Sequence, residues 1–93
     1  MLTFSNTIIT DKTYLNLNLV QTILFNEFCF DGTEIDVCHI VFYTDGTANV
    51  IANLDESEDK TPCYTTWRSS SFPVIRDKKL YQNLCDLCLT END

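Results

Sequence analysis

The side chains best suited to chemistry in this sequence are its cysteines and its single histidine. Cys85 and Cys88 form a Cys-x-x-Cys pair near the C-terminus. Such a pair is redox-active at a helix N-terminus, where the helix dipole lowers the thiol pKa. Here the pair falls late in an expected helix and encloses Asp86, and both features oppose thiolate formation. We therefore expect the two cysteines to pack as small apolar side chains.

A zinc site is the alternative for the same pair. Two further ligands would be needed, and the candidates are Cys38, His39 and Cys63. Cys38 and His39 are neighbours on an expected strand and point to opposite faces, so at most one of them could join. The chain has five cysteines, and an odd number suits a reduced protein better than a disulfide framework. We predict no metal and no cofactor.

His39 could also serve as the base of a Cys–His nucleophile pair. That arrangement needs a cysteine beside His39 and a third group that orients the ring. Cys29 or Cys63 could approach it in space, but no spacing in the sequence brings them together. The two glycines cannot build a phosphate-binding loop, and no zinc-protease or nucleophile-elbow motif occurs. We therefore predict no catalytic residues and no enzyme.

Carboxylates are the most abundant groups that could recognise a partner. The 93 residues include 14 Asp and Glu against 6 Lys and Arg, which gives a net charge of −8. This balance argues against direct nucleic-acid binding, because phosphate neutralisation by basic residues supplies most of that affinity. On one expected strand, Glu34 and Asp36 would lie about 6.6–6.8 Å apart, much like phosphates along a nucleic-acid strand. A basic groove on another protein would attract such an array.

We therefore predict a small inhibitor that binds a nucleic-acid-binding protein with a basic groove, through an acidic surface that mimics nucleic acid. In size and charge the chain resembles the small acidic inhibitors encoded by phages and mobile elements, such as anti-restriction proteins and anti-CRISPRs. The resemblance is one of composition and involves no shared motif. It implies that the partner is a host defence protein. The predicted partner-binding residues are Asp31, Glu34, Asp36, Asp45, Asp55, Glu56, Glu58, Asp59, Tyr64 and Trp67.

The alternative is a generic protein-interaction module or a homodimer. Trp and Tyr dominate binding hot spots, so an aromatic patch could carry the contact. An edge strand with Trp67 could also pair with a second copy. No apolar run reaches the roughly 18 residues of a membrane span, and the N-terminus lacks a signal-peptide pattern, so we expect a cytoplasmic protein. The residues available for the aromatic patch are Tyr43, Tyr64, Trp67, Phe72 and Tyr81.

The elements that position these side chains are clearest over residues 34–54. Two β-rich runs flank Asp45-Gly46, a pair typical of the two-residue type I′ hairpin turn. That turn would place Tyr43 opposite Ala48, with His39 on an otherwise apolar face. The other face is mixed in character, so the sequence leaves open which face is buried.

The remaining elements follow from hydrophobic spacing. Residues 2–10 and 61–67 are rich in β-branched and aromatic side chains and predict strands. Residues 18–30 and 77–89 each place apolar side chains on one helical stripe and predict helices. The expected fold is one α+β domain over residues 1–93. Two helices would pack on an antiparallel sheet of three to four strands, in the order β-α-β-β-β-α.

Overall fold

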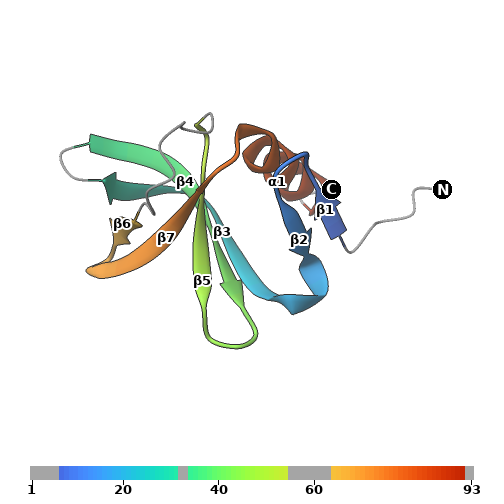
Figure 1. The fold of residues 1–93 in the computed structure, drawn as a ribbon, viewed down its shortest axis with the longest axis horizontal. Coiled ribbons are helices and arrows are strands. Elements are labelled where there is room, and N and C mark those ends of the chain that lie inside the picture. Colours follow the sequence, from blue (N-terminus) through green and yellow to red (C-terminus); the bar gives the residue numbers. More distant parts are fainter. Residues whose placement is uncertain (1–6, 32–33, 55–63, 92–93) are drawn as a thin grey trace.

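A computed structural model describes residues 7–31, 34–54 and 64–91, without the side chains of residues 31, 34 and 88–91. The described part is mostly β, with one α-helix (Figure 1). In chain order the elements are β1 (Thr7–Ile9), β2 (Tyr14–Asn16), the 3-10 turn η1 (Leu17–Leu19), β3 (Val20–Asp31), β4 (Glu34–Tyr43), β5 (Ala48–Ala52), β6 (Tyr64–Trp67), β7 (Ser70–Arg76) and α1 (Lys78–Glu91).

Five strands close into a barrel in the order β3-β4-β5-β7-β6. β3, β4 and β5 are consecutive antiparallel neighbours, and β6 returns to pair with β3, which is the arrangement of a Greek key. β7 fills the remaining gap, antiparallel to β6 and parallel to β5. β6 therefore has a partner on each side, and the strand that carries Trp67 is not the edge strand that the sequence predicted.

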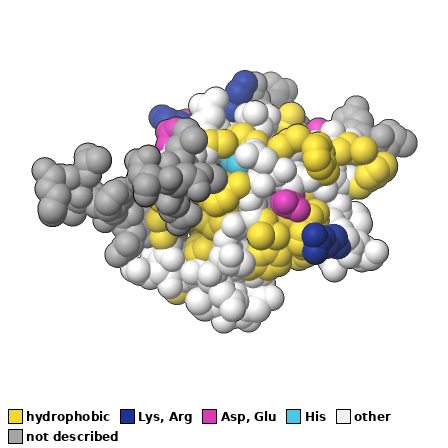
Figure 2. Space-filling view, turned by 180° about the vertical axis from the view of Figure 1, so that it is seen from behind, with side chains coloured by type: hydrophobic (Ala, Val, Ile, Leu, Met, Phe, Trp, Pro, Cys, Tyr) yellow, Lys and Arg dark blue, Asp and Glu magenta, His cyan; other side chains and the backbone are white. Residues whose placement is uncertain are grey.

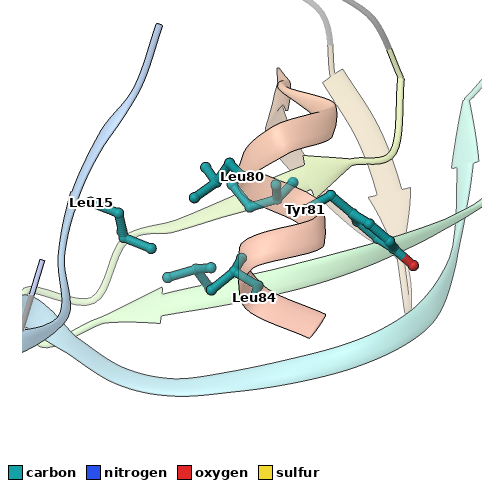
Figure 3. Close-up of a cluster of buried hydrophobic side chains, with 6 residues drawn as sticks. Leu15, Leu80, Tyr81 and Leu84 are labelled. Atoms are coloured by element: carbon teal, nitrogen blue, oxygen red, sulfur yellow. The ribbon is translucent and has the colours of Figure 1, made fainter. Parts of the chain in front are cut away.

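A second layer, formed by α1 and the β1–β2 hairpin, lies against the outside of the barrel (Figure 1). Along β4 and β5, alternate side chains enter two different cores. Ile40 and Val50 join a cluster to which all five barrel strands contribute, so this cluster fills the barrel interior. Val41 and Ile51 point outward and pack with the helix, whose buried side chains are shown in Figure 3. Where β4 pairs with β5, both faces of the hairpin contribute side chains to a core, which is why its sequence did not reveal one inner face.

The segment 18–30 departs most from expectation. We predicted a helix there, and the chain forms one turn of 3-10 helix followed by the twelve-residue strand β3. Its apolar side chains do not share one stripe: Ile23 and Phe25 join the outer core, whereas Leu24 enters the barrel. Pairing with β4 along its length outweighs the helical spacing. The predicted α+β fold with an open sheet and two helices is therefore wrong.

The β4–β5 hairpin forms where the sequence predicted it, but with a different turn. Phe42, not Tyr43, pairs with Ala48. The N–H of Tyr43 donates to the carbonyl of Thr47 at 2.8 Å and encloses a three-residue loop, in which Gly46 has a φ of +91°. The predicted register is therefore wrong by one residue.

β7, like β2, is a strand that the sequence analysis did not predict. The run Ser69-Ser70-Ser71 favours a turn or linker, yet Ser70 and Ser71 already belong to β7. The turn before it consists of Arg68 and Ser69, with φ values of +49° and +68°. Positive φ at both central residues is the type I′ geometry, formed here without glycine or asparagine, so no turn signal marks it.

α1 forms where the sequence predicted the C-terminal helix over residues 77–89, but it begins at Lys78 and continues two residues further, to Glu91. Asp77 precedes it, and its Oδ1 accepts a hydrogen bond from the N–H of Leu80 at 3.1 Å. The other carboxylate oxygen, Oδ2, accepts from the hydroxyl of Thr10 at 2.6 Å. One buried carboxylate therefore caps the helix and ties it to the turn after β1.

Candidate functional site

A β-bulge in β3 decides which side chains of that strand reach the surface. Between Leu24 and Glu27 the pairing with β4 shifts, so that Phe25 and Asn26 together oppose His39. Asn26 has a φ of +56°, a left-handed conformation that asparagine tolerates. Bulges of this kind redirect the side chains that follow them.

After the bulge, the alternation of inward and outward side chains along β3 is shifted by one residue. Cys29 lies in the barrel core, whereas Phe28 and Phe30 point outward. Directly opposite them on β4 stand Val37 and Ile35, also facing outward. These four side chains are between 40% and 70% exposed. Two adjacent strands thus present large apolar side chains to solvent as two cross-strand pairs.

Tyr64 extends this surface onto β6. β6 pairs with β3 at Phe30 and Thr66, and Tyr64 lies two residues from Thr66, so it points the same way. Hydrophobic side chains cover much of the barrel on the face seen in Figure 2, with few acidic side chains among them. We call the exposed side chains on these three strands the apolar patch: Phe28, Phe30, Ile35, Val37 and Tyr64.

Ile35 and Val37 of the apolar patch lie on the outer face of β4, and further along the strand α1 covers this face. His39, two residues after Val37, is completely buried. Its ring stacks on Tyr81 of α1, with centroids 3.9 Å apart and planes at 5°, and makes a T-shaped contact with Phe25, with ring centroids 5.1 Å apart. The apolar patch therefore begins where the cover of α1 ends.

Both ring nitrogens of His39 have partners. The backbone N–H of Asn26 donates to Nδ1 at 3.1 Å, so the proton of the neutral ring is on Nε2, which faces Cys85 Sγ at 3.2 Å. Burial lowers the pKa of His39, and a hydrogen bond with the backbone of Tyr81 raises it by less. The Tyr81 hydroxyl donates to Asn26 Oδ1 at 2.8 Å. We call this group the His39 cluster: Asn26, His39, Tyr81 and Cys85.

The cysteine beside His39 is Cys85, not the predicted Cys29 or Cys63. Cys29 faces the barrel interior, and Cys63 lies outside the described residues. The hydrogen bonds run opposite to those of a catalytic pair, in which histidine takes the thiol proton while a third group accepts from its other nitrogen. Here the third group is the backbone N–H of Asn26, which donates to Nδ1 of His39. If the ring took up a second proton, Nδ1 would also become a donor, and two donors would then face each other. The geometry therefore provides no general base for the thiol.

Cys38 and His39 point to opposite faces of β4, as predicted, into the barrel interior and toward α1 respectively. No group of three or more His, Cys, Asp and Glu that could hold a metal ion occurs within the described part of the chain. Two of the proposed zinc ligands, Cys63 and the thiol of Cys88, fall outside that part.

The predicted acidic surface is described only in part. Asp31 and Glu34 form the last backbone pair of β3 and β4, and the structure does not describe their side chains. The carboxylates of the predicted acidic loop lie outside the described residues: Asp55, Glu56, Glu58 and Asp59.

The two predicted acidic residues whose side chains are described lie far apart. Asp36 and Asp45 are nine residues apart, which corresponds to about 25–30 Å along extended chain. Asp36 pairs with Cys29 and so lies on the interior face, near one end of the barrel. Asp45 accepts hydrogen bonds from the N–H and hydroxyl of Thr47 at 2.9 and 2.6 Å, which lower the pKa of Asp45. Asp45 therefore stabilises the hairpin turn, and these two carboxylates do not form one array.

The predicted aromatic patch does not form as a unit. Trp67 is half buried among Phe42 and Phe72 in the barrel core, and its Nε1–H donates to Glu27 Oε1 at 3.0 Å. Tyr43 and Tyr81 pack in the outer core. Of the aromatic residues considered, Tyr64 is the one that belongs to the exposed surface.

The sequence analysis missed four members of the apolar patch, although a signal was present. Phe28 and Phe30 alternate with polar or small residues before Asp31-Gly32, and Ile35 and Val37 alternate after it. Two such runs around a turn pair indicate a hairpin with one apolar face.

Comparisons with known protein families, with curated proteins and with solved structures find no match for this chain. Within the described residues, no helix has the length and apolar character needed to cross a membrane. The function therefore has to be inferred from the geometry described above.

Proposed function

We propose that this chain is a protein-binding module whose apolar patch docks on a partner protein. The observation that carries the proposal is the register of the patch: Phe28 faces Val37 and Phe30 faces Ile35, all directed to solvent. Large exposed apolar patches on soluble proteins mark interaction surfaces. Complete burial of each such side chain contributes about 1.5–3 kcal/mol, so the patch can anchor a complex.

Charge defines the chemistry of the partner. Association itself costs about 4–15 kcal/mol, so apolar burial needs support from complementary charges. The net charge of −8 favours a partner whose contact surface combines apolar side chains with Lys and Arg. A second copy of the chain is a poorer occupant, because it would bring two strongly negative molecules together.

A nucleic-acid-binding protein with a basic groove is the partner class that best fits this charge. We infer that the chain would act as its inhibitor, with the apolar patch as the anchor and acidic residues near the groove. The support for this narrower function is the net charge and the number of carboxylates in the sequence.

The experiment compares two double variants, each of which removes an exposed cross-strand pair. Phe30→Ser with Ile35→Ser removes a pair of the patch that is 49% and 59% exposed, and Ile9→Ser with Tyr14→Ser removes a pair of the β1–β2 hairpin that is 68% and 67% exposed. A partner captured from the native source is identified by mass spectrometry, purified, and titrated against each variant by calorimetry. We expect a loss of affinity of at least 30-fold for the patch variant and less than twofold for the control.

Two further readouts complete this test. Affinity for the purified partner should fall steeply between 50 and 500 mM salt, because charge attraction is screened. Equal losses in both double variants would contradict the assignment of the patch. A mass of two chains in light scattering, abolished by Phe30→Ser with Ile35→Ser, would assign the patch to a homodimer instead.

A further inference from the structure

The first half of β3 has one edge that no strand covers within the described part of the chain. β4 pairs with β3 along its length, whereas β6 pairs with β3 only at Phe30 and closes the barrel there. From Val20 to Leu24 the edge opposite β4 is therefore open. Such an edge presents unpaired backbone groups that another chain can bind. Charged side chains and proline commonly protect edge strands, and residues 20–24 contain neither.

The hydrogen bonds of the β4–β5 turn show which backbone groups lie on this edge. The N–H of Tyr43 donates to the carbonyl of Thr47 and so points toward β5. Because backbone groups alternate in direction along a strand, those of Phe42 point toward β3. Thr22 pairs with Phe42 and thus binds β4 through its own backbone. The N–H and C=O of the next residue, Ile23, point away from β4.

A groove lies beside this edge, between β3 and the last part of α1. Its volume is about 340 Å³, within the range of about 300–1,000 Å³ that is usual for ligand sites. A strand added to β3 would place every second side chain on the groove side. The groove can hold apolar side chains, because five half-buried apolar residues line it: Leu17, Val20, Ile23, Phe25 and Leu87.

Charge selects a basic occupant for the groove. Leu87 lies one turn before the end of α1 at Glu91, and the C-terminal carbonyls of a helix carry partial negative charge. None of the described residues that line the groove is basic. The net charge of −8 attracts cations and opposes the pairing of two β3 edges from two copies of the chain.

We propose that the free edge of β3 binds an extended segment of a partner protein in which basic and apolar side chains alternate. The segment adds a strand to β3, the binding mode known as β-augmentation. The N–H and C=O of Ile23 bind its backbone, and its apolar side chains enter the groove. Register shifts at Val20/Thr22 and Leu24/Glu27 keep the regular edge short, so the groove supplies much of the affinity. This site is separate from the apolar patch, and the inference does not rest on the proposed function.

Two synthetic heptapeptides serve as probes, one alternating Lys with Val and the other Lys with Leu. Each carries blocked termini and is titrated against the full-length chain by NMR. We expect saturable binding with a Kd below about 1 mM. Replacing every Lys by Glu, or grouping the same residues in blocks, should weaken binding at least tenfold. Absence of saturable binding by both lysine peptides, or equal binding of the glutamate peptides, would overturn the proposal.

Amide hydrogen exchange places the peptide on the edge. In the free chain the N–H of Ile23 should exchange faster than the N–H of Thr22, because Thr22 binds β4 and Ile23 faces solvent. A saturating lysine peptide should slow exchange at Ile23 at least tenfold and leave Thr22 within twofold. Slow exchange at Ile23 in the free chain would show that the edge already has a partner. That result, or fast exchange at Ile23 in the complex, would overturn the proposal.

Matched variants test the groove. Leu87→Ala shortens a side chain that lines it, and Ile8→Ala shortens a side chain of the same outer core that does not. Both residues are half-buried. We expect Leu87→Ala to weaken peptide binding at least fivefold and Ile8→Ala to change it less than twofold. Equal effects of the two variants, each folded by circular dichroism, would overturn the proposal. Where Leu87→Ala does not fold, exchange at Ile23 in the wild-type chain decides the question.

The apolar patch supplies the last control. Phe30→Ser with Ile35→Ser leaves the groove intact and should change peptide affinity less than twofold. A tenfold loss in this variant would overturn the proposal, because it would place the peptide on the patch instead of the free edge.

Discussion

The outer face of β4 has two halves that share an apolar character and differ in what covers them. Val41 and His39 lie under α1 and are completely buried. Ile35 and Val37, on the same face of the same strand, remain open to solvent. α1 reaches only part of the strand, so the covered half stabilises the fold and the bare half is available to a partner.

The boundary between the halves is the bulge at Phe25 and Asn26. Asn26 binds His39 through its backbone and Tyr81 through its side chain, so the bulge is held by the covered half. Beyond it, Phe28 and Phe30 turn outward. One local irregularity thus anchors α1 on one side and creates the apolar patch on the other.

The largest difference between the two halves is expected when a large apolar side chain is truncated to alanine in each. Leu84→Ala, on the face of α1 that covers β4, should lower the free energy of unfolding by about 2–5 kcal/mol, because it leaves a cavity in a packed core. Ile35→Ala, in the bare half, should change it by less than about 0.5 kcal/mol. Urea unfolding measures both values. Equal losses would mean that the two halves are not distinct.

Asp77 tests how α1 is attached. Burial alone would raise its pKa, but hydrogen bonds from Thr10, Thr13 and the helix N-terminus outweigh it and lower the pKa below its ordinary value of 3.8. Its stabilising effect is therefore complete at neutral pH and is lost as pH falls below 3.8 through the folded-state pKa.

We expect Asp77→Ala to cost about 1–2 kcal/mol at pH 7, the usual value for a lost helix cap. Thermal unfolding of Asp77→Ala against wild type gives this value. A difference that persists undiminished at pH 2 would contradict the role of the charged carboxylate.

His39 makes the covered half sensitive to pH. Its folded-state pKa is below the unfolded value of 6.5, so the unfolded chain binds a proton first as pH falls. The free energy of unfolding should therefore decrease below pH 6.5, by at most about 1.4 kcal/mol per pH unit, until the folded-state pKa is reached. The measurement is urea unfolding at pH 7.5 and pH 5 for wild type and His39→Gln. Identical pH dependence in the two proteins would exclude this contribution.

The smallest effect is expected at the bulge itself. Asn26→Gly keeps the left-handed backbone without strain and removes the side-chain hydrogen bond with Tyr81, so it should cost about 0.5–1.5 kcal/mol. Asn26→Ala should cost more than the glycine variant, because alanine also disfavours the positive φ. Comparing the two variants by urea unfolding separates backbone strain from the hydrogen bond. The reverse order of stability would contradict the bulge assignment.

Local signals allowed part of this fold to be predicted. The hairpin around Asp45-Gly46 and the helix after Asp77 each depend on turn or capping residues within a few positions. The register of the hairpin was missed because Asp45 and Thr47 favour a three-residue loop through side-chain hydrogen bonds.

Non-local pairing explains what the sequence did not reveal. β3 lacks clear alternation because both of its faces are partly buried and the bulge interrupts its period. β7 depends on parallel pairing with β5, more than twenty residues away. Local alternation indicates that Phe28, Phe30, Ile35 and Val37 share one face, but the outward direction of that face depends on the bulge. The bulge in turn depends on His39 and Tyr81, which are distant in the sequence.

Hydroxyl-radical footprinting of the chain, alone and in complex with its purified partner, tests the central claim most directly. The proposal predicts that oxidation of Phe28, Phe30 and Tyr64 falls on binding, whereas Tyr14, equally open to solvent on the β1–β2 hairpin, keeps its rate. Protection of Tyr14 with unchanged oxidation of Phe28 and Phe30 would contradict the claim that the bare half of the barrel is the docking surface.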